Sequence, residues 1–194
     1  LATIMTIASI VVAYPIAYFI VRTPSSTLRR LLLLIVMGTF LSGGITRAYA
    51  WMILLGNSGV LNTIFKGLGF GSIQLLYNKL GVGIAFVHFM VPFCVLTLVG
   101  ALQTIPSNLV EAATSLGASR IRSFWSVVFP LSVPGLMGAT LLTFALASSA
   151  FLFPLLLGGG KVRLMSNHIY EIIFTTFNFS DAAVAAIVLL VATF

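Results

Sequence analysis

The chain has 194 residues, of which 60% are hydrophobic and only 7% are charged, and its mean hydropathy is +1.17. A soluble domain carries about 25% charged residues and could not cover so much apolar surface, so the composition excludes an ordinary water-soluble fold. The formal net charge of +7 reflects scarce acids and short basic loops. Because no basic stripe with interleaved aromatics is present, the charge does not indicate nucleic-acid binding.

Five apolar runs follow one another along the chain, and a helix needs about 20 apolar residues to cross a bilayer. They predict membrane helices at residues 1–21, 31–55, 82–102, 133–157 and 181–194, all in one domain covering residues 1–194. The last run is too short to span, and both chain ends lie in apolar runs, so we expect a piece of a longer bundle. The predicted fold class is therefore an all-α polytopic transmembrane helix bundle.

The second run contains Gly43, Gly44 and Arg47, which predict a bend or a cavity lining in its outer third. The loop before this run, residues 22–30, has three arginines and no acid, which is typical of a cytoplasmic loop. Alternation of sides then makes residues 103–130 cytoplasmic, and residues 56–79 and 158–180 external.

The loop at residues 103–130 is the most polar stretch of the chain and is expected to contain two short helices. Asn108 with Glu111 three residues later matches a capping box for a helix over Leu109–Leu116. Gly117 suits the left-handed residue that ends a helix. Ser119 can cap the second helix, and Pro130 is expected to end it.

The second short helix is predicted to be amphipathic, because its apolar residues repeat at helical spacing on one stripe. These residues are Ile121, Phe124, Trp125 and Val128. The loop is therefore predicted to be a compact knob at a membrane surface rather than a slack linker.

Five residues of this loop keep the spacing of a known signature: Glu111, Ala112, Ala113, Gly117 and Pro130. The pattern resembles the EAA signature of ATP-binding-cassette (ABC) importer permeases, with Val and Phe at the two apolar positions before the proline. The resemblance implies a type I importer permease fold in the bacterial inner membrane. It also implies a coupling helix that docks in a groove of a separate ATPase, where Glu111 either caps its own helix or pairs with a basic group on the ATPase.

The same resemblance implies three protein partners besides membrane lipid. They are a pair of ABC ATPase subunits, a second permease subunit that is identical or related, and an extracytoplasmic substrate-binding protein. ATP and Mg²⁺ would bind to the ATPase, so the chain is expected to carry no cofactor, no metal and no catalytic residue. The two histidines, His88 and His168, lie far apart and have no metal-ligand spacing.

Four further segments are similar to permeases of the spermidine/putrescine group: 47–62, 75–93, 129–135 and 153–160. The similarity implies a polyamine or another small organic amine as cargo, with aminophosphonates, opines, ferric iron and thiamine as alternatives in the same group. A secondary transporter or channel is the competing class. It would place ionisable residues within its helices, where only Arg47 and His88 are found.

Candidate residues of the substrate pathway are Tyr49, Trp51, Glu171 and Asp181. The two acids either contribute to an outer vestibule or serve as interfacial anchors and helix caps. The two aromatic residues, like Tyr14 and Tyr18, either line the pathway or belong to the aromatic belt at the membrane surface.

Overall fold

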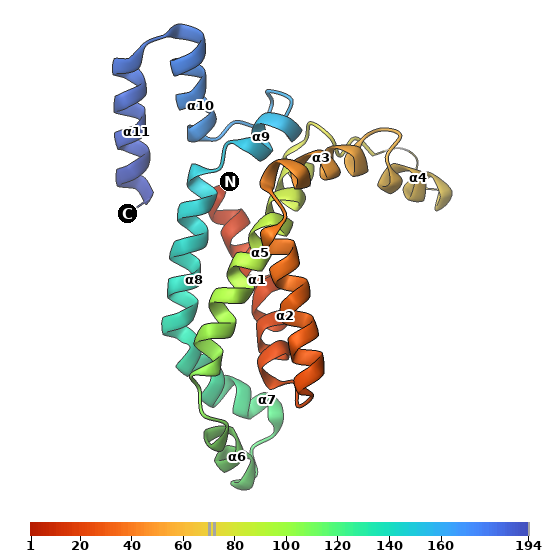
Figure 1. Cartoon of the computed structure of the whole chain (residues 1–194), viewed down its shortest axis with the longest axis vertical. Helices are drawn as coiled ribbons and strands as arrows, with labels where there is room; N and C mark the ends of the chain where they lie inside the picture. Colours follow the sequence, from red (N-terminus) through yellow and green to blue (C-terminus); the bar gives the residue numbers. More distant parts are fainter. Residues whose placement is uncertain (70, 72, 194) are drawn as a thin grey trace. The chain divides into compact units, whose positions relative to one another are not determined.

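The computed structural model describes residues 1–69, 71 and 73–193, and every regular element within them is helical (Figure 1). The helices are α1 (Ala2–Arg22), α2 (Ser26–Leu41), α3 (Gly44–Leu55), α4 (Val60–Gly67), α5 (Lys79–Gln103), α6 (Ser107–Ser115), α7 (Arg120–Ser123), α8 (Phe129–Ser149), α9 (Leu152–Leu157), α10 (Met165–Glu171) and α11 (Phe179–Thr193). Two π-helical turns, Phe124–Val128 and Ile172–Thr176, follow α7 and α10 directly. The predicted all-α class is confirmed, as expected for a chain whose backbone must satisfy its own hydrogen bonds in lipid.

Three helical stretches are long and apolar enough to cross a membrane: α1, α5 and the continuous stretch Arg120–Ser149. Helices α2 and α3–α4 meet the same criterion only together, as a broken pair, and α11 is a shorter apolar helix. The predicted loop at residues 56–79 contains α4. Three residues of the predicted segments, Phe70, Ser72 and Phe194, lie outside the described part of the chain.

The predicted run at residues 31–55 is divided where the sequence suggested a bend, because α2 ends at Leu41 and α3 begins at Gly44. Gly43 is extended, with φ −59° and ψ 145°, and a pair of glycines weakens the helix at this point. The break frees the carbonyl of Ser42, which accepts hydrogen bonds from Nη2 and Nε of the buried Arg47 at 2.8 and 3.1 Å. A helix break at membrane depth is tolerated when protein groups re-satisfy the backbone in this way.

The predicted run at residues 133–157 is also divided, since α8 ends at Ser149 and α9 begins at Leu152. The carbonyls of the two residues between them are taken by side chains of α10. Ser166 Oγ donates to the carbonyl of Ala150, and Asn167 Nδ2 donates to that of Phe151, both at 2.8 Å. These bonds fix the start of α10 at the end of α8.

By their internal contacts the residues form two compact units. Unit 1 comprises residues 1–6, 41–90 and 144–194, and unit 2 comprises residues 7–40 and 91–143. The core of unit 1 gathers around the rings of Phe86, Phe89 and Phe153, whose centroids lie 5.0–6.3 Å apart. The Arg47 guanidinium lies 5.0 Å from the centre of the Phe89 ring.

Unit 2 is built from the neighbouring parts of α1, α5 and α8, together with α2, α6 and α7. Its buried core is mostly small and aliphatic: Ala13, Ala17, Ile20, Cys94, Val95, Leu98, Val99, Leu102, Ile105, Val128 and Ala139. A Cβ atom on Gly135 of α8 would overlap the side chain of Ala101 of α5, so the two backbones approach closely at this point. Small residues at helix contacts are typical of membrane bundles, where close packing replaces the hydrophobic effect.

Candidate functional site

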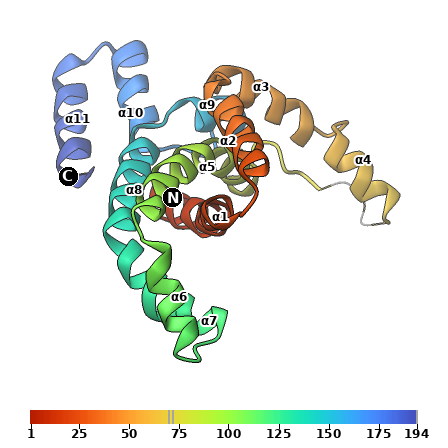
Figure 2. The same ribbon diagram turned by 60° about the horizontal axis from the view of Figure 1, so that its bottom comes forward.

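The polar loop of residues 103–130, called the knob below, lies at one end of unit 2 beyond the ends of α5 and α8 (Figures 1 and 2). It consists of α6, α7 and the π-helical turn that leads into α8. Buried Leu102 and Ile105 anchor its start in the core of unit 2. The knob is therefore a folded projection held at both ends by packed residues.

Helix α6 begins earlier than the sequence predicted. Its N-cap is Pro106, no side chain caps it, and Ser107 is its first residue. The predicted capping box of Asn108 and Glu111 is therefore wrong, because Asn108 already lies inside the first helical turn. Glu111 is exposed, and within the described residues no hydrogen bond or ion pair reaches its carboxylate.

The end of α6 is the bend that the sequence predicted at Gly117. This glycine has φ +85°, and its N–H donates to the carbonyl of Thr114 at 3.0 Å. The next N–H, of Ala118, donates to the carbonyl of Ala113 at 3.0 Å. The two bonds together form a Schellman motif, which requires a left-handed residue at this position. The prediction for Gly117 is confirmed.

The second half of the knob differs from the prediction at Pro130. Ser119 caps α7 as expected, since its Oγ accepts from the N–H of Arg122 at 3.3 Å. Pro130 does not end this helix, and the helical path continues to Ser149. The π-helical turn just before it shifts the hydrogen-bond register, so that Phe129 donates to the carbonyl of Phe124. A proline without an N–H is accommodated next to such a turn.

The predicted apolar stripe of the second helix divides between the core and the surface. Val128 is buried in the core of unit 2. Phe124 packs edge-on against two tyrosines of α1, with centroid distances of 5.9 Å to Tyr14 and 5.1 Å to Tyr18. The hydroxyl of Tyr14 is 2.7 Å from Ser132 Oγ at the start of α8. These two tyrosines thus hold the knob, a role that sequence reasoning missed although their i, i+4 spacing places them on one helix face.

Much of the remaining apolar surface of the knob is exposed. The exposed fractions are 89% for Leu116, 74% for Ile121, 58% for Trp125 and 42% for Leu109. Val110 is the residue of α6 that packs against the core of unit 2. Isolated helices shorter than about 12 residues are marginally stable in water. Helix α6 has nine residues and few contacts with the core of unit 2, so a second protein surface that packs against it would stabilise it.

Basic residues gather at the same end of unit 2. The contact between Tyr18 and Phe124 places the C-terminal part of α1 beside the knob. The arginines of the knob therefore lie at the same end as those at the end of α1 and the start of α2: Arg22, Arg29, Arg30, Arg120 and Arg122.

The four candidate pathway residues do not form one site. No hydrogen bond, ion pair or ring contact joins them within the described residues. Tyr49 is half exposed, and Trp51 Nε1 donates to Nδ1 of His88 at 3.2 Å. Glu171 pairs with Arg163 in an ion pair of 2.8 Å.

Asp181 does not cap α11 as the sequence suggested. The cap is Asn178, whose Oδ1 accepts from the N–H of Asp181 at 3.2 Å. Its Nδ2 in turn donates to the carboxylate of Asp181 at 2.7 Å. Asp181 therefore lies within the first turn of α11 and binds the side chain of the capping residue.

Comparisons with known proteins find relatives among transport permeases. The spermidine/putrescine transport system permease protein PotB of Haemophilus influenzae is 34% identical over 166 residues, which cover 84% of this chain and 58% of that protein. PotB of Escherichia coli is 32% identical over 169 residues, 86% of this chain and 61% of the relative. The chain thus spans about three fifths of the length of these curated relatives.

Solved structures of importers share the architecture. A bacterial ABC transporter that imports the acidic polysaccharide alginate matches with a TM-score of 0.81 at 19% identity, over 99% of this chain and 72% of that one. A bacterial alginate ABC transporter in complex with an alginate pentasaccharide-bound periplasmic protein matches with the same TM-score of 0.81 at 19% identity. The family model of the binding-protein-dependent transport system inner membrane component matches residues 2–194. The chain therefore belongs to the family of binding-protein-dependent transport inner membrane components, and its type I permease fold is confirmed.

Proposed function

We propose that the chain forms one half of the translocation pathway of an ATP-driven importer, and that the knob couples it to separate ATPase subunits. A second permease chain would supply the other half of the pathway, and an extracytoplasmic binding protein would deliver the cargo. ATP and Mg²⁺ would bind on the ATPase, so this chain would carry neither a cofactor nor a catalytic residue. The complex would lie in the bacterial inner membrane, in contact with lipid.

The observation that supports the proposal most strongly is that the knob exposes a short helix with a defined C-terminal cap. Helix α6 presents Leu116 and Leu109 to its surroundings and is held by one narrow stripe. Such a surface favours a protein groove that buries both the leucines and the helix. The cluster of arginines at the same end of unit 2 supports a cytoplasmic location for the knob.

Each signature residue would contribute differently to docking. Ala112 and Ala113 have small side chains that let a partner backbone approach, and the exposed carboxylate of Glu111 is available to a basic group of the ATPase. Gly117 gives the bend its shape. Pro130 would stiffen the junction through which the knob moves α8.

Two lines of support favour a polyamine or a similar small organic amine as cargo. The PotB relatives are spermidine/putrescine permeases by name, and the similarity extends over more than four fifths of this chain. The other cargoes of the group, aminophosphonates, opines, ferric iron and thiamine, remain the comparison set for transport assays. A secondary transporter or channel would leave the exposed helix of the knob without a partner.

Thiol labelling tests both the orientation and the docking. Leu116→Cys places a thiol on a side chain that is 89% exposed, whereas the native Cys94 is buried. We expect a membrane-impermeant maleimide to label this variant only from the cytoplasmic side, and only after the ATPase has been stripped away. A matched variant, Leu68→Cys, lies in the predicted external loop at 66% exposure and should be labelled only from outside. Labelling of Leu116→Cys from outside, or equal labelling with the ATPase bound, would contradict the proposal.

A further inference from the structure

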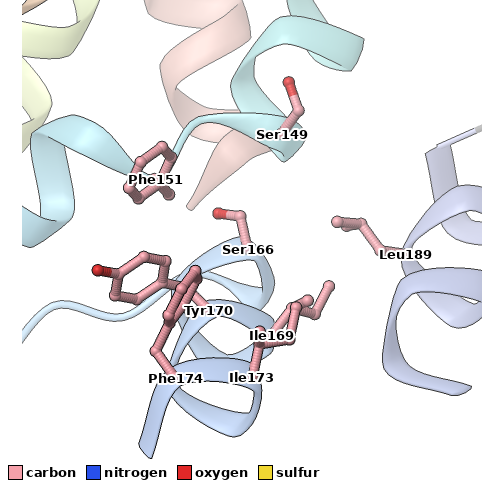
Figure 3. A pocket seen from close by; sticks show the side chains of 8 residues that line it. All are labelled: Ser149, Phe151, Ser166, Ile169, Tyr170, Ile173, Phe174 and Leu189. Atoms are coloured by element: carbon pink, nitrogen blue, oxygen red, sulfur yellow. The ribbon is translucent and has the colours of Figure 1, made fainter. Parts of the chain in front are cut away.

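A cavity of about 300 Å³ lies in unit 1 among the end of α8, α10 and α11, and the functional assignment does not use it (Figure 3). Its lining includes three aromatic side chains, from Phe151, Tyr170 and Phe174, and the hydroxyl side chains of Ser149 and Ser166. Small-ligand pockets have volumes of about 300–1,000 Å³ and combine apolar walls with a few polar groups. The cavity therefore has the size and lining of a site for a small molecule.

The three rings pack in sequence, with Phe151 stacked on Tyr170 and Phe174 tilted against the same tyrosine. Phe151 and Tyr170 lie nearly parallel, with an interplanar angle of 20° and centroids 5.6 Å apart. Tyr170 and Phe174 follow at 4.6 Å and 37°. Figure 3 shows the rings of Tyr170 and Phe174 side by side on one face of their helix, with Phe151 nearby. Aromatic faces attract cations within about 6 Å of the ring centre.

The helix that carries two of these rings is irregular where they lie. Phe174 is part of the π-helical turn Ile172–Thr176, and the next residue, Phe177, has φ +52°. Single π-helical turns cost stability and occur frequently at functional sites. The Phe174 ring is also 60% exposed, so a ligand would remove apolar surface from solvent.

A carboxylate lines the neighbouring cavity. Glu171 lines a neighbouring cavity of about 210 Å³, and Tyr170 lines both cavities. The partner of Glu171 is Arg163 at 2.8 Å, and the two side chains are 44% and 58% exposed. Exposed ion pairs contribute little to stability, so an ammonium group can replace the guanidinium on this carboxylate at small cost.

We propose that the aromatic cluster of Phe151, Tyr170 and Phe174 binds an ammonium group of the cargo at a ring face that no neighbouring ring covers, that of the exposed Phe174, while Glu171 binds a second ammonium of the same molecule. The inference rests on the proposed importer function, and it assigns these two cavities to the two charged ends of the proposed amine cargo. Tyr170 divides the two cavities, so the ligand would extend past this ring from one cavity into the other.

The test is the affinity of the complete transporter for a linear diamine when Phe174 is replaced by mono-, di- and trifluorinated phenylalanine. Fluorine withdraws charge from the ring face without changing its shape much. Because cation–π contacts contribute about 0.5–2 kcal/mol, the Kd should rise stepwise, by about 2-fold to 30-fold in total. The same series at the exposed Phe177, which does not line the cavity, is the control and should leave the Kd unchanged.

Two further variants separate the ammonium sites. Tyr170→Phe keeps the ring and should keep the affinity, whereas Tyr170→Leu should lose it. Glu171→Gln should weaken binding of a diamine but not of a monoamine of equal length. A flat Kd across the fluorinated series at Phe174, or equal effects on an uncharged analogue, would overturn the proposal and indicate an apolar occupant such as a lipid chain.

Failure of this site and failure of the amine assignment give different results. If the unaltered transporter imports a diamine while the fluorinated series stays flat, the aromatic site is wrong and the importer function stands. If the unaltered transporter binds and imports no amine at all, both the site and the amine cargo are wrong.

Discussion

Gly117 offers the sharpest perturbation of the knob. Its φ of +85° lies in the left-handed region, and a Cβ placed on it would meet nothing within 4 Å. The cost of a side chain here is therefore conformational rather than steric, about 1–2 kcal/mol for an ordinary L residue. That cost changes the ratio of bent to unbent loops by a factor of about 5–30. β-Branched residues are strongly disfavoured at positive φ, so Gly117→Val should lie at the upper end of this range.

The assay is cargo uptake and ATP hydrolysis by the reconstituted complex. We expect Gly117→Val to insert normally, since the position lies outside the packed core, and to lose cargo-stimulated transport by a factor of up to about 30. Gly117→Asn is the matched control, because asparagine tolerates the left-handed region, and it should stay close to the parent. Equal transport by the valine and asparagine variants would refute the reasoning that the shape of the bend matters.

Three other changes test the packing around the site. Gly135→Ala should destabilise the protein by about 1–3 kcal/mol because its methyl group would overlap Ala101. Gly138→Ala is the control and should be neutral or stabilising, since a Cβ atom there meets nothing within 4 Å. Melting temperatures in detergent would show the difference, and equal values for the two variants would contradict the close contact. Arg47→Met should cost about 1–3 kcal/mol because it removes the hydrogen bonds from the buried guanidinium to the carbonyl of Ser42, and an unchanged melting temperature would count against this bonding role. Phe124→Ala should loosen the knob, seen as faster proteolysis within α6 than in the parent.

The membrane helices were predictable where the length and the apolar composition of a segment are enough to identify a membrane span. The runs at residues 1–21 and 82–102 correspond to α1 and α5, because nothing but helix satisfies the backbone over such apolar stretches. The break at Gly43 was suggested by the glycine pair. The hydrogen bond by which Arg47 satisfies the carbonyl of Ser42 at this break was not predictable, because the periodicity of the sequence does not reveal such a contact.

The knob was predictable in outline and not in its local bonds. The bend at Gly117 follows from the special backbone of glycine, and the cap at Ser119 follows from its side chain. The start of α6 was misjudged because Asn108 and Pro106 are both good helix-start residues, and the tertiary structure uses the proline. The passage through Pro130 depends on a π-helical turn, which has no reliable sequence signal.

The aromatic cavity was hidden for a different reason. Phe151 lies at a break between two helices, nineteen residues before Tyr170. The two rings meet only because Asn167 bonds the carbonyl of Phe151 and fixes α10 there. Local spacing could suggest the pair Tyr170 and Phe174, but not the third ring.

Transport by this chain is expected to depend on ATP hydrolysis by a separate ATPase. The most direct test of this dependence is accumulation of diamines, aminophosphonates, opines, thiamine and ferric iron in vesicles that contain the permease, the ATPase and the binding protein. We expect one organic amine to accumulate only when ATP is hydrolysed and the binding protein is present. Accumulation driven by an ion gradient, with the ATPase absent, would contradict the account and assign the chain to the secondary transporters.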